Sequence, residues 1–289
     1  MQIVTDRGCD ISQEQLEGLD IHFAPMRLTL DGKTYSSGED LSSAEFYDLL
    51  EKTEGMPVTS QATTGDFAAL YRKLAEKDPD ILSIHISSGL SGTLQSAIAG
   101  AQMVPEARVT HWDTMTLSCP QAWQVELAAR AVKKGWSKDA ILAMLARIRS
   151  ITEGIFTVED LKYLIHGGRI SHITGLLASL LRIRPVIAVG KEDGKYYTLA
   201  KERTTRHALQ KIAESLLKFY PEGAPLRVQL LHGKNQPAVD ILKAEVEKRF
   251  TCHWLPTTNV GPILGAHTGG SLVGLSVAPE QWINQAISL

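Results

Sequence analysis

Residues 81–97 read Ile81-Leu-Ser-Ile-His-Ile-Ser-Ser-Gly-Leu-Ser-Gly-Thr-Leu-Gln-Ser-Ala97, and the rest of the predicted fold is built around them. The short apolar run at their start is typical of a buried strand. The chain then turns through hydroxyl and glycine residues from Ser87 to Thr93, and an apolar stripe from Leu94 onward predicts a helix. Because the first N–H groups of a helix lack partners within it and its dipole is positive there, this junction suits a small anionic group.

The turn from Ser87 to Thr93 also has a simpler interpretation, in which it only caps the helix and glycine makes the bend. Four hydroxyls and two glycines in seven residues favour a ligand site. The turn matches neither the nucleotide motif Gly-x-x-x-x-Gly-Lys nor the dinucleotide fingerprint Gly-x-Gly-x-x-Gly. The run from Gly89 to Thr93 approaches the nucleophile elbow of hydrolases, but Thr93 stands where that motif has its second glycine.

The composition indicates a globular protein, since 289 residues with 44% hydrophobic and 21% charged residues can bury a sizeable core. A net charge of -2 without a basic run argues against a nucleic-acid binder. The first residues lack the pattern of a signal peptide, and no apolar run approaches the roughly 20 residues that span a bilayer. Cys9, Cys119 and Cys252 are scattered and form no Cys-x-x-Cys pair, so we expect a cytoplasmic protein.

The order of strands and helices predicts an α/β fold with two domains. Up to about residue 150, strands alternate with amphipathic helices, which indicates an α/β sandwich with a largely parallel sheet. Beyond that point, hairpins and long returns indicate a second α/β domain with a mixed or antiparallel sheet. We therefore expect one domain at residues 1–150 and another at residues 151–289.

Two local features add detail to this scheme. Asp31-Gly32 is a strong turn pair and predicts a hairpin between strands at residues 23–30 and 33–35. The segment from Gly175 to Leu181 is an unusually apolar predicted helix that ends ahead of Pro185.

Three further polar segments are candidate ligand sites. Thr59-Ser60-Gln61 precedes a predicted helix and fits either a turn with a cap or a ligand site. Arg169 lies in Gly167-Gly-Arg-Ile-Ser171, where its guanidinium suits either a carboxylate or phosphate, held in a bidentate manner, or a surface ion pair. His267-Thr268 lies in a glycine-rich predicted loop at residues 261–270, where the histidine is either an anion donor or a hydrogen-bonded structural group.

Taken in order along nearly the whole chain, these segments resemble the DegV family, the bacterial fatty-acid-binding proteins also called FakB. The resemblance is carried by six motifs together, and none of them settles it alone. They are Ile3-Val-Thr-Asp6, Thr59-Ser-Gln61, Ser87-Ser-Gly-Leu-Ser-Gly92, Val158-Glu-Asp-Leu-Lys-Tyr-Leu164, Gly167-Gly-Arg-Ile-Ser171 and the run from Gly261 to Gly269.

The resemblance implies two α/β domains that hold an acyl chain between buried walls. It implies that Thr59 and Ser91 hold the carboxylate, with His267 and Arg169 near the head group. The expected ligand-binding set is completed by neighbours of these residues in the same motifs, namely Ser60, Ser88, Gly89 and Thr268. In such a protein the apolar segment from Gly175 to Leu181 is a candidate tunnel wall, although ordinary core explains any one of its leucines.

The resemblance also implies a carrier and not an enzyme, with no catalytic residue, metal or cofactor of its own. Its ligand would be a long-chain fatty acid. Its protein partner would be an ATP-dependent fatty-acid kinase subunit, faced in part by Arg169, which makes an acyl phosphate for phospholipid synthesis. Transient contact with a membrane surface is compatible with this role, and nucleic acid is not an expected partner.

Two positions depart from the family pattern. Arg7-Gly8-Cys9 replaces the small hydroxyl residues usual after Thr-Asp, so the first loop is expected to differ. The family's His-Thr-Gly-Pro-Gly reads His267-Thr-Gly-Gly-Ser271 here, with Gly270 and Ser271 as the differing residues, and a looser loop is expected there. Neither change removes a proposed head-group donor.

The physical chemistry of a fatty acid agrees with a tunnel of this kind. Burying a methylene contributes about 0.8 kcal/mol, so ~14 of them contribute on the order of 11 kcal/mol. Association and ordering of the chain oppose this by ~4–15 kcal/mol. The acyl chain would therefore supply most of the affinity, and the head-group donors would chiefly set orientation and favour an acid over an alcohol or ester.

Two other functions remain open from the sequence. A serine hydrolase would use Ser91 and His267, with Asp6 or Asp113 as the orienting carboxylate. Turn chemistry explains those two aspartates, and Asp10 near another strand end, more simply than a polar cluster does. A nucleotide- or phosphate-binding module would use the same helix N-terminus.

Overall fold

The computed structural model describes residues 1–172 and 183–288. A parallel sheet of four strands lies in the first half of the chain, in the order β2-β1-β6-β7. These strands are β1 (Gln2–Asp6), β2 (Ile21–Ala24), β6 (Asp80–His85) and β7 (Arg108–Asp113). The sequence prediction of a largely parallel sheet here is confirmed.

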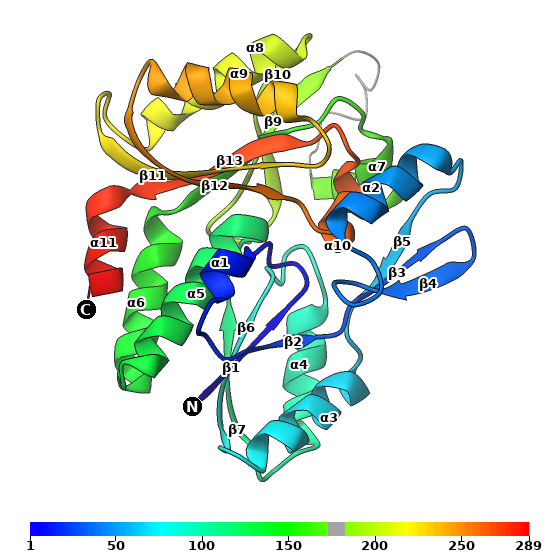
Figure 1. Ribbon diagram of the computed structural model, residues 1–289, viewed down its shortest axis with the longest axis vertical. Helices are drawn as coiled ribbons and strands as arrows, with labels where there is room; N and C mark the ends of the chain where they lie inside the picture. The colour runs from blue at the N-terminus through cyan, green and yellow to red at the C-terminus, as the bar shows by residue number, and fades with distance from the viewer. Residues whose placement is uncertain (173–182, 289) are drawn as a thin grey trace.

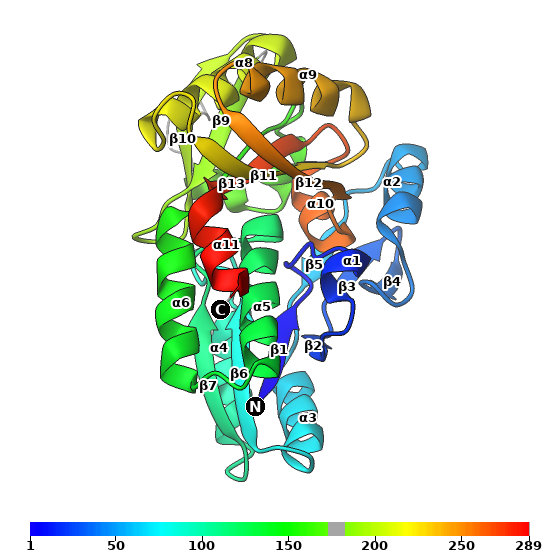
Figure 2. The ribbon, with the colours of Figure 1, turned by 60° about the vertical axis from the view of Figure 1, so that its left-hand side comes forward.

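Helices cover both faces of this sheet (Figure 2). The pair α5 (Ser118–Lys133) and α6 (Lys138–Ile151) lies on one face, and the pair α3 (Thr64–Ala75) and α4 (Thr93–Gln102) lies on the other. Successive residues of a strand point to opposite faces, so Ile3 packs with the first pair and Val4 with the second. Burial on both faces explains why neighbouring residues of β6, such as Ile81 and Leu82, are both apolar.

A small antiparallel sheet projects from the first half in the order β4-β3-β5 (Figure 1). It consists of β3 (Arg27–Leu30), β4 (Lys33–Ser36) and β5 (Val58–Ser60). In the chain, α1 (Gln13–Leu16) precedes β2, and α2 (Ser43–Lys52) connects β4 to β5. The predicted hairpin turn at Asp31-Gly32 is confirmed, and both residues have the positive φ, 48° and 75°, that such a turn requires.

The single strand predicted at residues 23–30 is wrong. Its first part belongs to β2 in the parallel sheet, and its second part is β3 in the small sheet. Pro25 stands between them, and proline cannot donate the N–H that a continuous strand needs.

The second half of the chain contains a six-stranded mixed sheet in the order β10-β9-β8-β13-β11-β12. The sequence predicted a mixed or antiparallel sheet here, and this is confirmed. Strands β11 and β12 pair in parallel, and the other pairs are antiparallel. The strands are β8 (Glu153–Thr157), β9 (Arg184–Val189), β10 (Tyr196–Glu202), β11 (Pro225–His232), β12 (Thr251–Asn259) and β13 (Val273–Pro279). The domain boundary near residue 150 stays a prediction.

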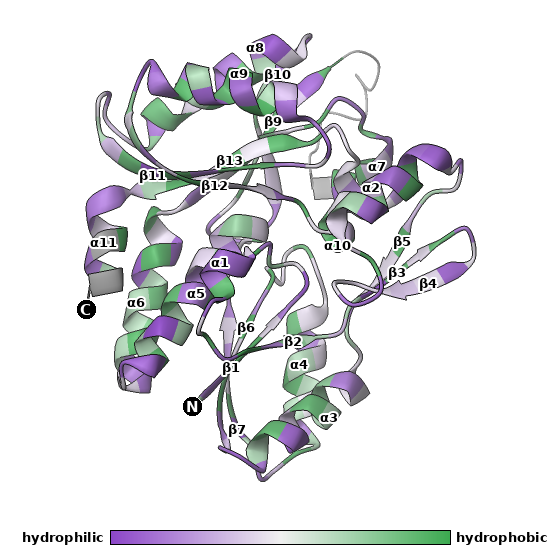
Figure 3. Cartoon of the chain, in the orientation of Figure 1, coloured by the Kyte–Doolittle hydropathy of each residue, from purple (hydrophilic) through white to green (hydrophobic). Residues whose placement is uncertain are grey.

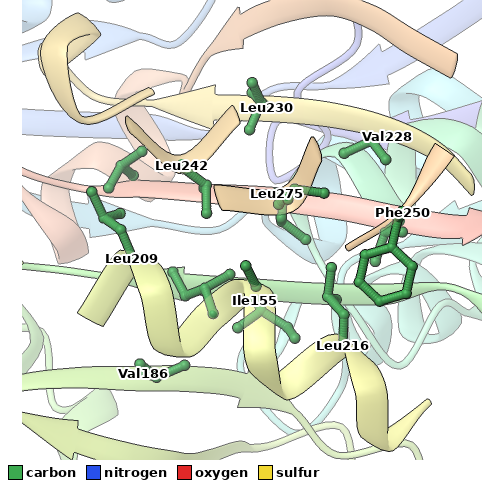
Figure 4. Close-up of a cluster of buried hydrophobic side chains, with 14 of the residues drawn as sticks. Ile155, Val186, Leu209, Leu216, Val228, Leu230, Leu242, Phe250 and Leu275 are labelled. Atoms are coloured by element: carbon green, nitrogen blue, oxygen red, sulfur yellow. The ribbon is translucent and has the colours of Figure 1, made fainter. Parts of the chain in front are cut away.

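The outer face of this sheet is covered by α8 (Thr205–Ser215) and α9 (Gln236–Glu247) (Figure 1). Figure 4 shows Leu209 and Leu216, from α8 and the turn after it, packed on Ile155, Val186 and other strand residues. Figure 3 shows hydrophobic and hydrophilic residues mixed on both helices, as expected of helices with one buried face.

The inner face of the sheet is apolar too, and it faces the first half of the chain. Phe156 and Ile187 alternate with the residues that face α8, and they pack with Ile86 and Leu90 of the first half. The contact between the two halves therefore contains a hydrophobic core of its own.

Further helices in the described part of the second half are α7 (Lys162–His166), α10 (Pro262–Thr268) and α11 (Glu280–Ser288). The loop predicted at residues 261–270 is wrong, because most of it is α10. Pro262 occupies the first helical turn, where its fixed φ suits a helix, and Ile263 and Leu264 are buried. The sequence did not predict α11. The predicted apolar helix from Gly175 to Leu181 lies outside the described residues.

No helix within residues 1–172 or 183–288 is both long enough and apolar enough to span a membrane.

A buried aspartate links the first loop to helices from both halves. Asp10 accepts hydrogen bonds from the Ser118 hydroxyl at 2.5 Å, at the start of α5, and from the Gly261 N–H at 2.8 Å, at the start of α10. Burial of the carboxyl raises its pKa from 3.8 to about 6, although both hydrogen bonds act to lower that pKa.

Replacing Asp10 with Asn is expected to change how stability depends on pH. Between about pH 4 and pH 6 the folded protein binds a proton that the unfolded chain has released, so the contribution of Asp10 to the free energy of unfolding falls as the pH rises, by about 3 kcal/mol in total. The wild-type free energy of unfolding minus that of Asp10→Asn should therefore decrease by about 2 kcal/mol, most of this total, between pH 4 and pH 7 in urea titrations. A difference that stays constant with pH would show that Asp10 titrates normally.

Candidate functional site

Four of the residues predicted to bind the ligand line one cavity, although they come from four separate segments. Thr59 is on β5, Ser91 precedes α4, Arg169 begins a 3₁₀ turn after α7, and His267 is on α10. The cavity has a volume of about 90 Å³. It is completed by Met26, Gln61, Ile86, Leu90, Leu117, Tyr196, Ile263 and Leu264.

His267 and Thr59 form a hydrogen-bonded pair, with 2.8 Å between the Thr59 hydroxyl and His267 Nε2. Gly167 packs on the ring so closely that a Cβ there would lie 2.0 Å from His267 Nδ1. Burial, together with the smaller effect of the positive charge of Arg169, lowers the pKa of His267 from 6.5 to about 4. The imidazole is therefore neutral at pH 7.

Ser91 lies at the N-terminal end of α4. Its hydroxyl is 2.8 Å from the Thr93 hydroxyl and accepts the Thr93 N–H at 3.3 Å. Gly92, the residue before α4, has no side chain to cap the helix, so Ser91 and Thr93 supply the hydroxyls at this end. The turn therefore supplies hydroxyls to the end of the helix and also places one of them at the cavity. The capping role and a cavity position are thus compatible, and ligand binding by Ser91 stays a prediction.

Arg169 brings a positive charge to the same cavity. Its guanidinium donates to backbone carbonyls, with Nε 3.3 Å from the Leu90 oxygen and a second nitrogen bonded to the Gly167 oxygen. Within the described ranges Arg169 forms no ion pair with a carboxylate of the protein. The surface ion pair that was an alternative from the sequence is therefore not formed there, and the charge remains available to an anion.

Sequence reasoning did not single out Tyr196 or the Gln61 side chain as cavity residues. Tyr196 is buried on β10 and lines both this cavity and an adjoining one. Gln61 lines the cavity and donates from Nε2 to the Ser96 hydroxyl at 2.9 Å. Strand alternation could place Tyr196 on one face of β10, but it could not show that this face meets the first half of the chain.

The adjoining cavity is almost entirely apolar and has a volume of about 40 Å³. It lies between the inner face of the mixed sheet and the first turns of α5, and it shares Leu117, Tyr196 and Leu264 with the polar cavity. Pockets that bury a drug-sized molecule have volumes of roughly 300 Å³ or more. A long acyl chain would fit only if the side chains around the two cavities moved apart.

The remaining predicted residues do not line the polar cavity. Ser60 and Ser88 are exposed. Thr268 lines the apolar cavity, but its hydroxyl donates to the Leu264 carbonyl at 3.1 Å. At Gly89, a Cβ would lie only 2.3 Å from the Asp193 carbonyl oxygen. The glycine is therefore needed for the approach of another part of the chain, and not for the approach of a ligand.

The two departures from the family pattern both have partners in the structure. The Arg7 guanidinium stacks over the Phe23 ring at 4.1 Å, and the Gly8 N–H donates to Asp6 at 2.8 Å. The Gly270 carbonyl accepts the Lys234 N–H at 2.7 Å. The loop after His267 is thus anchored, contrary to the looser loop expected from the sequence.

The hydrolase alternative requires a hydrogen bond from Ser91 to His267. Among the described residues, the Ser91 hydroxyl pairs with Thr93 and the His267 ring pairs with Thr59. Asp6 is 2.9 Å from His85, and Asp113 accepts backbone N–H groups. The geometry therefore provides no nucleophile–base–acid arrangement at Ser91.

Comparison with known proteins identifies relatives over almost the whole chain. The model of a family described as "Uncharacterised protein, DegV family" matches residues 1–280. A DegV domain-containing protein of Deinococcus radiodurans is 34% identical over 280 residues, which cover 97% of this chain and 96% of that protein. One of Staphylococcus aureus is 33% identical over 275 residues, which cover 95% of this chain and 97% of that protein.

Solved structures of similar proteins have the same fold. A DegV family protein of Thermus thermophilus, described by its fatty acid binding, superposes with a TM-score of 0.85 and 29% identity over 96% of this chain and 99% of that one. The fatty-acid-binding DegV of Bacillus subtilis gives a TM-score of 0.85 and 28% identity over 96% of this chain and 99% of that one. The predicted arrangement of two α/β domains agrees with this fold.

The His267 ring is expected to remain neutral across the physiological range. Because burial lowers its pKa to about 4, its ring resonances should not shift between pH 5 and pH 8 in an NMR titration. The variant His267→Gln, which lacks these resonances, assigns them. A titration midpoint near pH 6.5 would contradict the buried, unprotonated state.

Proposed function

This chain belongs to the DegV family, and we propose that it binds one long-chain fatty acid. The carboxylate would lie in the polar cavity, held by Thr59 and Ser91, and the acyl chain would extend into the apolar cavity. Relatives at 28–29% identity with the same fold are described as fatty-acid-binding proteins, which supports this ligand class.

One observation carries the proposal: a cavity with hydroxyl, imidazole and guanidinium groups adjoins an apolar cavity across three shared residues. A fatty acid has the same division, with one polar end and a long apolar remainder. Substrates with several polar groups would leave those groups without partners in the apolar cavity, which is unfavourable.

The head-group donors form a connected set. A neutral His267 can donate from Nε2 to the Thr59 oxygen, which leaves the Thr59 O–H free to donate into the cavity. Ser91 provides a second hydroxyl, and Arg169 a positive charge nearby. Together these groups favour a carboxylate over an ester, which carries no charge and accepts hydrogen bonds more weakly.

Leu117, Tyr196 and Leu264 would have to move when an acid binds, because they line both cavities. Large side chains in a packed interface move together with the elements that carry them. We therefore expect binding to be accompanied by a change at the contact between the two halves, and not only by rotation of one side chain.

We further propose that the protein is a carrier and not an enzyme. It would present the bound acid to an ATP-dependent fatty-acid kinase subunit, with Arg169 near the partner, and the acyl phosphate would enter phospholipid synthesis. Among the described residues Ser91 and His267 are not hydrogen-bonded to each other, which favours a carrier over a hydrolase at this site. Cytoplasmic location and transient contact with a membrane surface belong to the same proposal.

The purified protein is expected to contain or take up a long-chain acid in a one-to-one ratio, measured by mass spectrometry of the extract after denaturation. Thr59→Val and Ser91→Ala should each weaken acid binding by about 1–3 kcal/mol, because each leaves a buried polar group unpaired. Thr34→Val, on β4 of the same small sheet as Thr59, with its hydroxyl exposed and bonded to Thr29, is the matched control and should bind normally. Failure of the wild-type protein to hold any acid would refute the proposal.

Acyl phosphate should form only when the acid-loaded protein, a fatty-acid kinase subunit and ATP are all present. Because Arg169 is expected near both the head group and the partner, Arg169→Ala should slow this reaction by at least tenfold. Phosphate transfer can be followed with γ-labelled ATP and mass spectrometry of the product. Equal rates with free acid in place of the loaded protein would show that the kinase does not need this carrier.

A further inference from the structure

The turn that presents Ser91 contains another serine with more hydrogen bonds than Ser91 itself. Ser87 is fully buried and lines neither cavity. Its N–H donates to the Thr116 carbonyl at 2.8 Å, and its own carbonyl accepts the N–H groups of Leu90 at 3.0 Å and Ser91 at 3.1 Å. The backbone position of Ser91 is therefore set by a direct bond to Ser87.

The Ser87 side chain binds the other half of the chain. Its hydroxyl donates to the Gly194 carbonyl at 2.8 Å and accepts the Gly89 N–H at 3.1 Å. Gly194 lies in the turn between β9 and β10 and has a φ of 65°, which favours glycine. One hydroxyl thus joins the turn before α4 to a turn of the mixed sheet.

Two glycines make this contact possible. A Cβ on Gly194 would lie 1.9 Å from the Ser87 hydroxyl oxygen, and a Cβ on Gly89 would lie 2.3 Å from the Asp193 carbonyl. The two turns are therefore in direct contact, through the Ser87 hydroxyl at Gly194 and through backbone atoms at Gly89 and Asp193. A contact of this kind transmits position accurately, because backbone atoms in turns have little freedom to adjust.

The same contact also places part of the cavity wall. Tyr196 follows Gly194 by two residues at the start of β10, and it lines both the polar and the apolar cavity. The Ser87 carbonyl is thus bonded to Ser91, whose hydroxyl faces the polar cavity, and the Ser87 hydroxyl is bonded to Gly194, in the turn that leads to Tyr196.

We propose that Ser87 is a positioning residue for head-group recognition: it fixes Ser91 relative to the β9–β10 turn, so that an acid is recognised only while the two halves of the chain are in contact. This inference rests on the proposed function of acid binding. Ser87, the first serine of the motif Ser87-Ser-Gly-Leu-Ser-Gly92, would thus connect the two halves of the protein without contacting the ligand.

The test compares the affinity for palmitate with that for hexadecanol, which has the same chain and no carboxylate. Ser87→Ala removes the bridging hydroxyl and should weaken palmitate binding roughly tenfold, or ~1.4 kcal/mol, while hexadecanol binding stays the same. Combined with Ser91→Ala, the Ser87→Ala change should cause no further loss, because both act through the Ser91 hydroxyl.

A second variant disturbs the same contact by adding a methyl group at Gly89, against the Asp193 carbonyl. Gly89→Ala should displace the β9–β10 turn and give the same selective loss of palmitate binding, so the test does not depend on the folding of Ser87→Ala alone. Ser215→Ala, another buried serine change, lies in α8 away from both cavities and should leave both affinities unchanged.

The outcomes separate this inference from the proposed function. If the wild-type protein binds neither palmitate nor other long-chain acids, the proposed function fails. If the wild-type protein binds palmitate and the Ser87→Ala and Gly89→Ala variants bind it equally well, the positioning role fails. Equal losses for palmitate and hexadecanol would also overturn it, because they would indicate general loosening of the interface.

Discussion

The buried carboxylate of Asp6 is the interaction on which the site depends. It accepts the N–H groups of Gly8 at 2.8 Å and Ile86 at 2.9 Å, and it lies 2.9 Å from His85 and 3.3 Å from the Gln121 amide. A buried carboxylate is tolerated only when its lone pairs are satisfied, and here the partners come from the loop after β1, from the end of β6 and the residue that follows it, and from α5. The carboxylate therefore connects β1 to the end of β6, directly before the turn that contains Ser87 and Ser91.

The site itself is made by contact between the two halves of the chain. Thr59 and Ser91 come from the first half, and His267 and Arg169 from the second. The apolar cavity is likewise walled by both, with α5 on one side and the mixed sheet on the other. Among the described residues, neither half lines either cavity alone, so binding of the proposed ligand would be coupled to association of the two halves.

The sequence predicted the features that depend on local pattern. The Asp31-Gly32 hairpin, the strand and turn at residues 81–93, and the mixed sheet all follow from short-range turn chemistry and periodicity. The convergence of Thr59, Ser91, Arg169 and His267 was reached through resemblance to a family, because no local pattern brings four distant segments together. The role of these residues in binding stays a prediction.

The features that the sequence missed depend on long-range packing. Residues 23–30 look like one strand in the sequence because apolar residues lie on both sides of Pro25. Only the pairing of β2 and β3 with different sheets shows that they are two strands. The helix that carries His267 was hidden by its glycines. At Gly265, a Cβ would lie 2.7 Å from the Tyr47 hydroxyl, so tertiary packing requires a glycine that local propensity disfavours in a helix.

The distance along the chain between the site residues has a consequence for synthesis. The Thr59–His267 hydrogen bond joins residues 208 positions apart, and the Asp10–Gly261 bond joins residues 251 apart. Closing loops of this length is entropically costly and slow compared with forming local helices and hairpins. A nascent chain on the ribosome must therefore expose the apolar inner face of its mixed sheet until α10 has emerged, and the two cavities can form only after that.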